Sequence, residues 1–197
     1  QVKENPQVMS QCLQGTRLEE TLYNSIIHGA HMSSKRPLSS QEHRLSGMDD
    51  AVEFYYKQGW TDGLPVVPPT PEKVHEALER AGLAPSDVLG VVPVRGRVIT
   101  AEKAAINAVM AGCLPEYMPV VAAAVRAICD DPYNLHGTTA STMGASVLLV
   151  VNGPVRERLD FNRGGNALGP GWRANATVGR AIRLILMNVC GATPGVM

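Results

Sequence analysis

A glycine-rich run followed by an arginine is the part of this sequence best suited to bind an anion. Residues 164–171 contain four glycines within eight positions and lead into a predicted helix start. Glycines let backbone N–H groups turn toward a ligand, and a helix N-terminus favours negative charge. We expect Gly169, Gly171, Arg173 and Asn175 to bind a small anionic molecule. The alternative is a tight connection whose charged side chains face solvent.

The same run does not match the nucleotide-binding motifs. It has no Gly-Lys-Ser/Thr of a P-loop, and Gly169-x-Gly171-x-x-Ala174 neither follows a predicted strand nor precedes a suitably spaced acidic residue. We therefore expect no nucleotide cofactor, and the sequence assigns no other cofactor. Cys113, Glu116 and His136 are the candidate metal ligands, but they do not have the close sequence spacing typical of metal-binding motifs. No metal site is therefore predicted.

A lysine, an asparagine and a cysteine form a second candidate group. Lys103 and Asn107 lie four residues apart and share one face of a predicted helix, and Cys113 follows at a break before Pro115. A thiol beside a helix N-terminus can have a lowered pKa, as a nucleophile requires. Alternatively, Cys113 is a small core residue. We take Cys113 as the candidate nucleophile, Lys103 as a proton carrier, and Asn107 and Glu116 as binding residues.

An aspartate and a histidine complete the candidate catalytic set. Asp62 precedes Gly63 in a predicted turn, where it either bonds its own backbone or serves as a base at a pocket mouth. His136 lies in a polar loop before the apolar run 145–152, which suits an acid–base group or a ligand. Asp62 and His136 are therefore candidate proton carriers.

Periodicity and capping residues predict the elements that must position these side chains. We predict helices over residues 48–59, 71–81, 101–112, 116–129 and 173–189. We predict strands over residues 88–94, 97–100 and 145–152. The run 145–152 is apolar on both faces, which favours a central strand. We therefore predict an α/β fold, a mixed sheet with helices packed on it in a single domain.

Composition excludes several classes of protein. Eighteen basic residues balance eighteen acidic ones, whereas a nucleic-acid-binding domain normally has a basic excess. No apolar stretch is long enough to span a bilayer. The four cysteines form no C-x-x-C pair and are too few for a disulfide scaffold, so a cytoplasmic location is expected. The small-residue helices 101–112 and 118–129 are expected to be buried centrally or to form a homo- or hetero-oligomer interface.

The chain divides into three parts by sequence character. Residues 1–32 resemble an expression tag or non-native leader, and residues 33–47 form a polar, flexible lead-in. Residues 48–197 form the α/β domain, and the ending without a polar tail suggests a truncated C-terminus.

Three segments together resemble a little-characterised bacterial family that is often encoded near thioredoxin-like or "UGSC" cysteine/selenocysteine proteins. They are GWTDGLPVVPPT (59–70), AEKAAINAVMAGCLPEYMPVV (101–121) and GPGWRANATVGRA (169–181). The resemblance implies a functional surface that contains Asp62, Lys103, Asn107, Cys113, Glu116, Arg173 and Asn175. It also suggests a thiol-dependent lyase or hydrolase acting on a carbon–sulfur or similar bond. The alternative is a non-catalytic subunit that binds and orients a cysteine-bearing partner protein.

Overall fold

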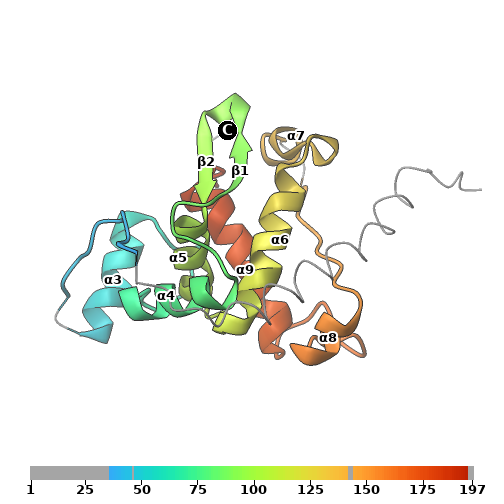
Figure 1. The fold of residues 1–197 in the computed structure, drawn as a ribbon, viewed down its shortest axis with the longest axis horizontal. Coiled ribbons are helices and arrows are strands. Elements are labelled where there is room, and N and C mark those ends of the chain that lie inside the picture. The colour runs from blue at the N-terminus through green and yellow to red at the C-terminus, as the bar shows by residue number, and fades with distance from the viewer. Residues whose placement is uncertain (1–35, 46, 142–143, 195–197) are drawn as a thin grey trace, which may run out of the picture.

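The computed structural model describes residues 36–45, 47–141 and 144–194, and most of its regular structure is helical (Figure 1). The predicted leader, residues 1–32, lies outside the described residues. The elements in chain order are α3 (Met48–Gln58), α4 (Pro71–Arg80), β1 (Val88–Val92), η1 (Pro93–Arg95), β2 (Arg97–Thr100), α5 (Ala101–Ala111), η2 (Pro115–Tyr117), α6 (Met118–Cys129), η3 (Asp131–Tyr133), α7 (Leu135–Thr139), α8 (Pro154–Arg158) and α9 (Arg173–Asn188).

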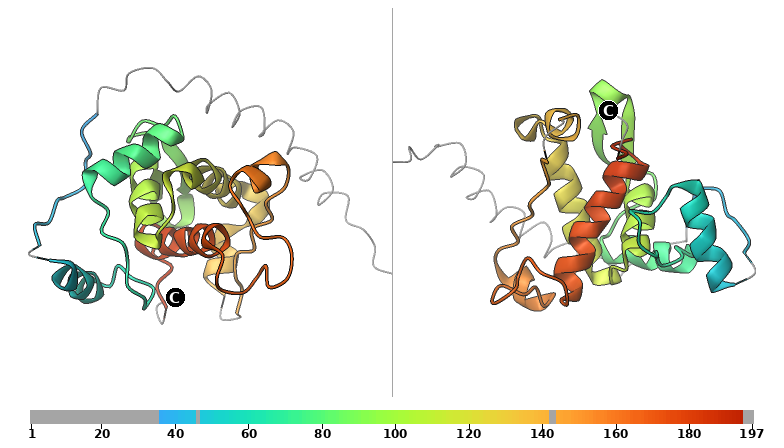
Figure 2. Two further views of the ribbon diagram at one scale, coloured as in Figure 1. Left: turned by 90° about the horizontal axis from the view of Figure 1, so that it is seen from below. Right: turned by 180° about the vertical axis from the view of Figure 1, so that it is seen from behind.

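Helix α5 forms the centre of the hydrophobic core. It packs against α9 on one side and α4 on the other, with α6 also in contact (Figures 1 and 2). Its buried alanines, Ala101, Ala104, Ala105 and Ala108, leave almost no side-chain bulk between α5 and its neighbours. The expectation that this small-residue helix is buried centrally is confirmed.

Local signals set the helix boundaries. The Thr100 hydroxyl accepts a hydrogen bond from the Lys103 N–H at 3.4 Å and caps the start of α5. Gly112 ends α5 in the left-handed conformation, with a φ of 89° that favours glycine. Pro71 occupies the first position of α4, where a missing N–H costs nothing. The predicted helices are confirmed to within a few residues.

The two described strands form a small antiparallel hairpin. Val91 pairs with Val98 and Val92 pairs with Arg97, and the chain reverses through η1 and Gly96. Gly90 of β1 lies against Cys129 at the end of α6 so closely that a Cβ atom there would stand 2.4 Å from the Cys129 sulfur. The fold prediction is therefore confirmed only in part: helices and strands are mixed, but the described sheet has two strands and the core is helical.

The predicted central strand is wrong. Residues 144–152 are extended but pair with no other described strand, and they run along the outer side of the molecule from α7 toward α8 (Figures 1 and 2). Val147, Leu149 and Val151 pack against the core, whereas Leu148 and Val150 are exposed. An apolar run indicates a preference for burial and extension, but it does not specify a pairing partner.

Candidate functional site

A pocket of about 240 Å³ lies at the C-terminal end of α5. Residues of α4, α5, the turn that follows α5, and the first residue of α9 line it. The turn is rigid, because the Cys113 N–H donates to the Ala108 carbonyl at 3.0 Å and Pro115 begins η2 directly afterwards. Cys113 therefore lies at a fixed position beside the pocket.

Arg173 ties the start of α9 to this turn. Its Nε and Nη2 donate to the Gly112 carbonyl at 3.1 and 3.0 Å. That carbonyl belongs to the end of α5, where helix carbonyls lack intrahelical partners and carry partial negative charge. The contact brings Arg173 and Cys113, predicted separately from the sequence, to the same pocket.

Two cations and one carboxylate line the pocket. Lys73 and Glu76 come from α4, and Arg173 comes from α9. Among the residues that the structure describes, the Lys73 ammonium group has no hydrogen bond or ion pair. A pocket wall with an excess of positive charge and a cation without a partner favours an anionic ligand.

The Cys113 thiol is protonated at neutral pH. Burial raises the pKa of this thiol to about 11, although the Thr177 hydroxyl and the Arg173 charge act in the opposite direction. Sequence reasoning predicted a lowered pKa from the following helix start, and that prediction is wrong. The reason is that η2 is a single short turn, and desolvation of the thiolate outweighs what its dipole supplies.

A second, larger cavity of about 720 Å³ lies along α5, from Lys103 to Met110. Lys103 and Asn107 line it, so the predicted helix face is confirmed. The Asn107 amide donates to the Lys103 carbonyl at 2.8 Å and accepts from Asn188 at 2.8 Å. The Asn188 amide also donates to the Trp60 carbonyl at 3.1 Å. These bonds hold α5, α9 and the loop after α3 together.

Aromatic side chains and the lead-in form the far wall of this cavity. Phe54 and Trp60 each pack against both His43 and Tyr55, and the Phe54 and Trp60 ring centroids lie 5.8 Å apart. Lys103 and Cys113 therefore belong to different cavities, and the predicted single site divides into two.

Asp62 lines neither cavity and forms a clamp with α9. Its carboxylate accepts two hydrogen bonds from Arg180, at 2.9 and 2.8 Å, and Arg180 also donates to the carbonyls of Leu64 and Pro65. The Arg180 hydrogen bond, together with its charge, lowers the pKa of Asp62 against the opposing effect of partial burial. An ionised carboxylate so well satisfied is a poor base, so the observed contacts fit a positioning role.

The glycine-rich run is organised by its own hydrogen bonds. The Asn175 side chain accepts from the Asn162 N–H at 2.9 Å and donates to the carbonyls of Asn162 and Ala167 at 2.9 and 3.1 Å. The Gly169 N–H donates to the Asn166 carbonyl at 2.9 Å. Neither Gly169 nor Gly171 lines either cavity. The Gly169 N–H and the Asn175 amide donate to carbonyls of the loop itself.

The remaining predicted residues lie apart from both cavities. Glu116 forms an exposed ion pair with Arg80 at 3.4 Å. His136 is exposed on α7, beyond the end of α6 (Figure 1). The described residues contain no group of three or more His, Cys, Asp or Glu side chains that could hold a metal ion. None of the described helices is long and apolar enough to cross a membrane.

Sequence reasoning missed the polar partners that position these groups. Lys73 and Glu76 lie three residues apart on α4, a spacing typical of any solvated helix face, so no sequence signal distinguished them. Arg180 and Asn188 occur within a long amphipathic helix, where their distant partners, Asp62 and Trp60, are invisible to local patterns. No family model, no curated protein and no solved structure matches this chain. The family resemblance of the three segments therefore stays a prediction.

Proposed function

We propose that this protein binds a small anionic molecule in the pocket between α4, the turn after α5 and the first residue of α9. The observation that carries the proposal is that Lys73, Arg173 and Cys113 line one pocket. Its volume of about 240 Å³ is below the roughly 300–1,000 Å³ typical of sites for drug-sized ligands. A ligand of a few heavy atoms with a carboxylate or a similar oxyanion fits this space.

Lys73 is the main source of attraction in this proposal. Arg173 already uses two donor groups on the Gly112 carbonyl, so it supplies its remaining N–H groups and its charge. Lys73 has all three ammonium hydrogens available among the described residues. The pocket thus combines a fixed guanidinium with a flexible ammonium group, a pair suited to a small oxyanion.

A thiol-dependent lyase or hydrolase acting on a carbon–sulfur bond is the catalytic form of this proposal. Cys113 would then need a base, because burial raises the pKa of its thiol to about 11. Glu76 is the carboxylate that lines the same pocket, and it is therefore the candidate base. Binding of the anion alone does not require transfer of the Cys113 thiol proton to Glu76.

Titration of the ¹⁵N-labelled protein with acetate and mercaptoacetate, followed by NMR, tests the binding proposal. We expect the amide signals of Gly112 and Cys113 to shift, and acetamide, which has a similar size but no charge, to produce much smaller shifts. Replacement of Lys73 by Gln should weaken acetate binding about 5- to 10-fold, which corresponds to about 1–1.4 kcal/mol.

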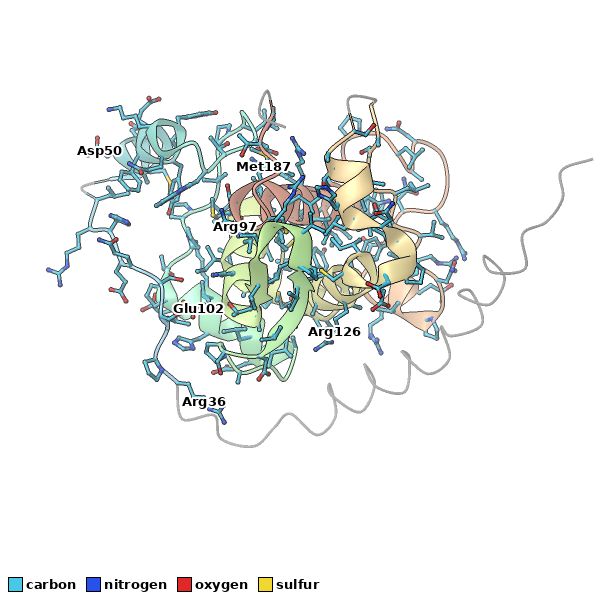
Figure 3. The ribbon with its side chains drawn as sticks, turned by 90° about the horizontal axis from the view of Figure 1, so that it is seen from above. Arg36, Asp50, Arg97, Glu102, Arg126 and Met187 are labelled. Atoms are coloured by element: carbon cyan, nitrogen blue, oxygen red, sulfur yellow. The ribbon has the colours of Figure 1, made fainter. Side chains whose placement is uncertain are left out.

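The matched control is Arg126→Gln, which removes an exposed cation from α6, a helix that contributes only Met118 to the pocket wall (Figure 3). It should leave acetate affinity unchanged. Equal responses to acetate and acetamide, or shifts centred on Lys103 instead of Cys113, would contradict the proposal. Loss of any turnover in Cys113→Ser with retained acetate binding would support the catalytic form.

The non-catalytic subunit remains the second candidate function. Leu148, Val150 and Leu168 are aliphatic side chains that are 70%, 73% and 91% exposed. That surface favours association with another polypeptide chain. Measuring acetate binding with and without an added partner chain distinguishes the two candidate functions. A non-catalytic subunit should bind the ligand only when the partner chain is present.

A further inference from the structure

The larger cavity is wide enough to hold a small organic molecule. Its volume of about 720 Å³ falls within the roughly 300–1,000 Å³ typical of such sites. Leu45, Met48 and Trp60 line this cavity, and all three side chains are exposed. Apolar surface in the described cavity therefore remains uncovered, and an apolar ligand would remove it from water.

Hydrogen bonds hold the walls of this cavity in place. The Asn188 amide of α9 donates to the Trp60 carbonyl at 3.1 Å and positions the loop after α3. The Ser39 and Ser40 N–H groups donate to the Glu102 carboxylate at 2.8–3.0 Å and position the lead-in. A cavity whose walls are positioned before binding loses less conformational entropy when a ligand enters.

The aromatic wall suits a flat ring and leaves no space for a cation between its own rings. The Phe54 ring centroid lies 5.9 Å from that of Tyr55 and 5.8 Å from that of Trp60. The His43 ring centroid lies 4.9 Å from that of Phe54 and 6.0 Å from that of Trp60. Rings in contact with one another cannot surround an ammonium group as an aromatic cage does. The surface that they turn to the cavity can instead pack against a further aromatic ring.

Lys103 and Asn107 supply hydrogen-bond donors one helical turn apart on α5. Both residues line the cavity, and among the described residues the Lys103 ammonium group has no hydrogen bond or ion pair. Asn107 is only 4% exposed, and its amide uses one of its two N–H groups on the Lys103 carbonyl at 2.8 Å. An ammonium charge beside a buried amide with a remaining N–H is suited to a carboxylate.

Glu42 brings a negative charge to the same cavity and would favour an amine instead. It lies on the exposed lead-in, where the described residues form no helix or strand. Lys103, by contrast, is held on a helix and has Asn107 as a second donor beside it. Two donors on a fixed element bind a charged group better than one acceptor on an irregular segment. An anionic ligand is therefore favoured over a cationic one.

We propose that the larger cavity binds an aromatic carboxylate, whose ring packs against Phe54 and Trp60 and whose carboxylate pairs with Lys103 and Asn107. A short linker between the ring and the acid is enough. The reason is that the Asn188 amide donates to both the Asn107 side chain and the Trp60 carbonyl, at 2.8 and 3.1 Å. The inference does not depend on the anion pocket, because the two cavities share no lining residue.

The fluorescence of Trp60 measures binding of phenylacetate to this cavity. The other tryptophan, Trp172, lines neither cavity, so the variant Trp172→Phe leaves Trp60 as the only reporter. We expect phenylacetate to change the Trp60 emission in a saturable titration. Octanoate, which carries the same charge on an aliphatic chain, should bind at least about fivefold more weakly. Acetate, which has no ring, should bind at least about tenfold more weakly.

Two lysine variants in the same background test the charge contact. Lys103→Gln should weaken phenylacetate binding about 5- to 10-fold, because the carboxylate loses its cation. The matched control is Lys57→Gln, which removes an exposed cation from α3 that lines neither cavity, and it should leave the affinity unchanged. Both side chains are exposed, and unchanged circular dichroism shows that both variants fold.

Four outcomes would overturn the proposal. They are no binding of phenylacetate, equal binding of octanoate, tighter binding of 2-phenylethylamine that Glu42→Gln abolishes, and a phenylacetate response lost in Lys73→Gln but kept in Lys103→Gln. The third would assign the cavity to an amine, and the fourth would place the acid in the anion pocket. The acetate titration at Cys113 reports on the other pocket, so the two proposals can fail separately.

Discussion

Three arginine side chains bond to backbone carbonyls that are far away in the sequence. Arg95 donates to the Cys190 carbonyl at 3.0 Å, Arg173 to that of Gly112, and Arg180 to those of Leu64 and Pro65. A guanidinium group has five donors in a fixed plane, so one side chain can satisfy several acceptors at a loop or helix end. These arginines therefore fix loops in place, and Arg173 does so at the edge of the anion pocket.

The buried thiols should make the protein less stable at alkaline pH. Burial raises the pKa of Cys190 from 9.0 to about 11. A raised pKa means that the unfolded state loses this proton first, so stability is full below about pH 9 and falls as the pH rises toward 11. At pH 10 the loss attributable to Cys190 should be on the order of 1 kcal/mol.

Urea unfolding of wild type and Cys190→Ala at pH 8 and pH 10 measures this loss. The alanine variant is less stable at pH 8, because it leaves a small cavity, but its stability should fall less between the two values. Identical falls in both proteins would contradict the prediction. The same experiment with Cys113→Ala examines the pocket thiol, whose pKa is also raised to about 11.

Individual residues were predicted well where their chemistry is local and poorly where it is not. Lys103 and Asn107 share a helix face because four residues make about one turn. Asp62 was recognised as a turn residue, but its partner Arg180 is 118 residues away, beyond any local pattern. Cys113 lines a pocket together with Arg173, yet the protonation of its thiol depends on burial, which sequence periodicity does not reveal.

At the level of elements, the helices are encoded by short-range signals, whereas the pairing of the run 145–152 is not. Thr100 and Gly112 delimit α5 within a dozen residues, so the sequence predicts both ends. Pairing of an extended run depends instead on which segments lie beside it. Its apolar residues predicted extension correctly but could not reveal that the described chain supplies no strand for it.

Two glycines in these elements should respond in opposite ways to the same substitution. Gly90→Ala should destabilise the protein by about 1–3 kcal/mol, because the new Cβ atom meets the Cys129 side chain at 2.4–2.7 Å. Gly179→Ala should stabilise it by about 0.5–1 kcal/mol, because Gly179 is exposed within α9 and a Cβ there meets nothing within 4 Å. Urea unfolding of both variants measures the two effects. An unchanged or raised stability of Gly90→Ala would show that the fit between β1 and α6 is looser than described, and a lowered stability of Gly179→Ala would contradict the expectation for α9.

Across the whole molecule, a buried carboxylate attaches the lead-in to the helical body. Glu102 at the start of α5 is only 2% exposed. It accepts hydrogen bonds from the Ser39 and Ser40 N–H groups at 2.8–3.0 Å and from the Ser39 hydroxyl at 2.8 Å. Figure 3 labels Glu102 and Arg36, which begins the described lead-in. Leu38, Ser40 and His43 are among the lead-in residues that line the larger cavity, so this contact also positions one of its walls.

Replacement of Glu102 by Gln should release this segment. Burial alone would raise the pKa of Glu102, but the hydrogen bonds from Ser40 and Ser39 outweigh it and lower the pKa. Its contribution to stability is therefore present above the usual value of 4.5 and is lost as the pH falls through the lowered pKa. Hydrogen exchange at pH 7 should be at least about tenfold faster at Ser39 and Ser40 in the variant, a loss of about 1.4 kcal/mol of local protection.

Glu79→Gln, which changes an exposed carboxylate on α4, is the control and should leave exchange in residues 36–45 unchanged. Equal protection of Ser39 and Ser40 in Glu102→Gln and wild type would mean that the lead-in is held by its apolar contacts instead. Loss of protection in the control as well would point to a general loosening of the helical body.

The position of α9 has a consequence for how the protein is made. Helix α9 is the last described element in the chain, yet it packs more extensively against α5 than any other element does. During translation, α4, α5 and α6 leave the ribosome before the helix that covers them has been synthesised. Their alanine- and valine-rich faces are open to chaperones and to other nascent chains for that interval. Slow translation through residues 130–172 would lengthen this exposure without altering a single contact in the finished protein.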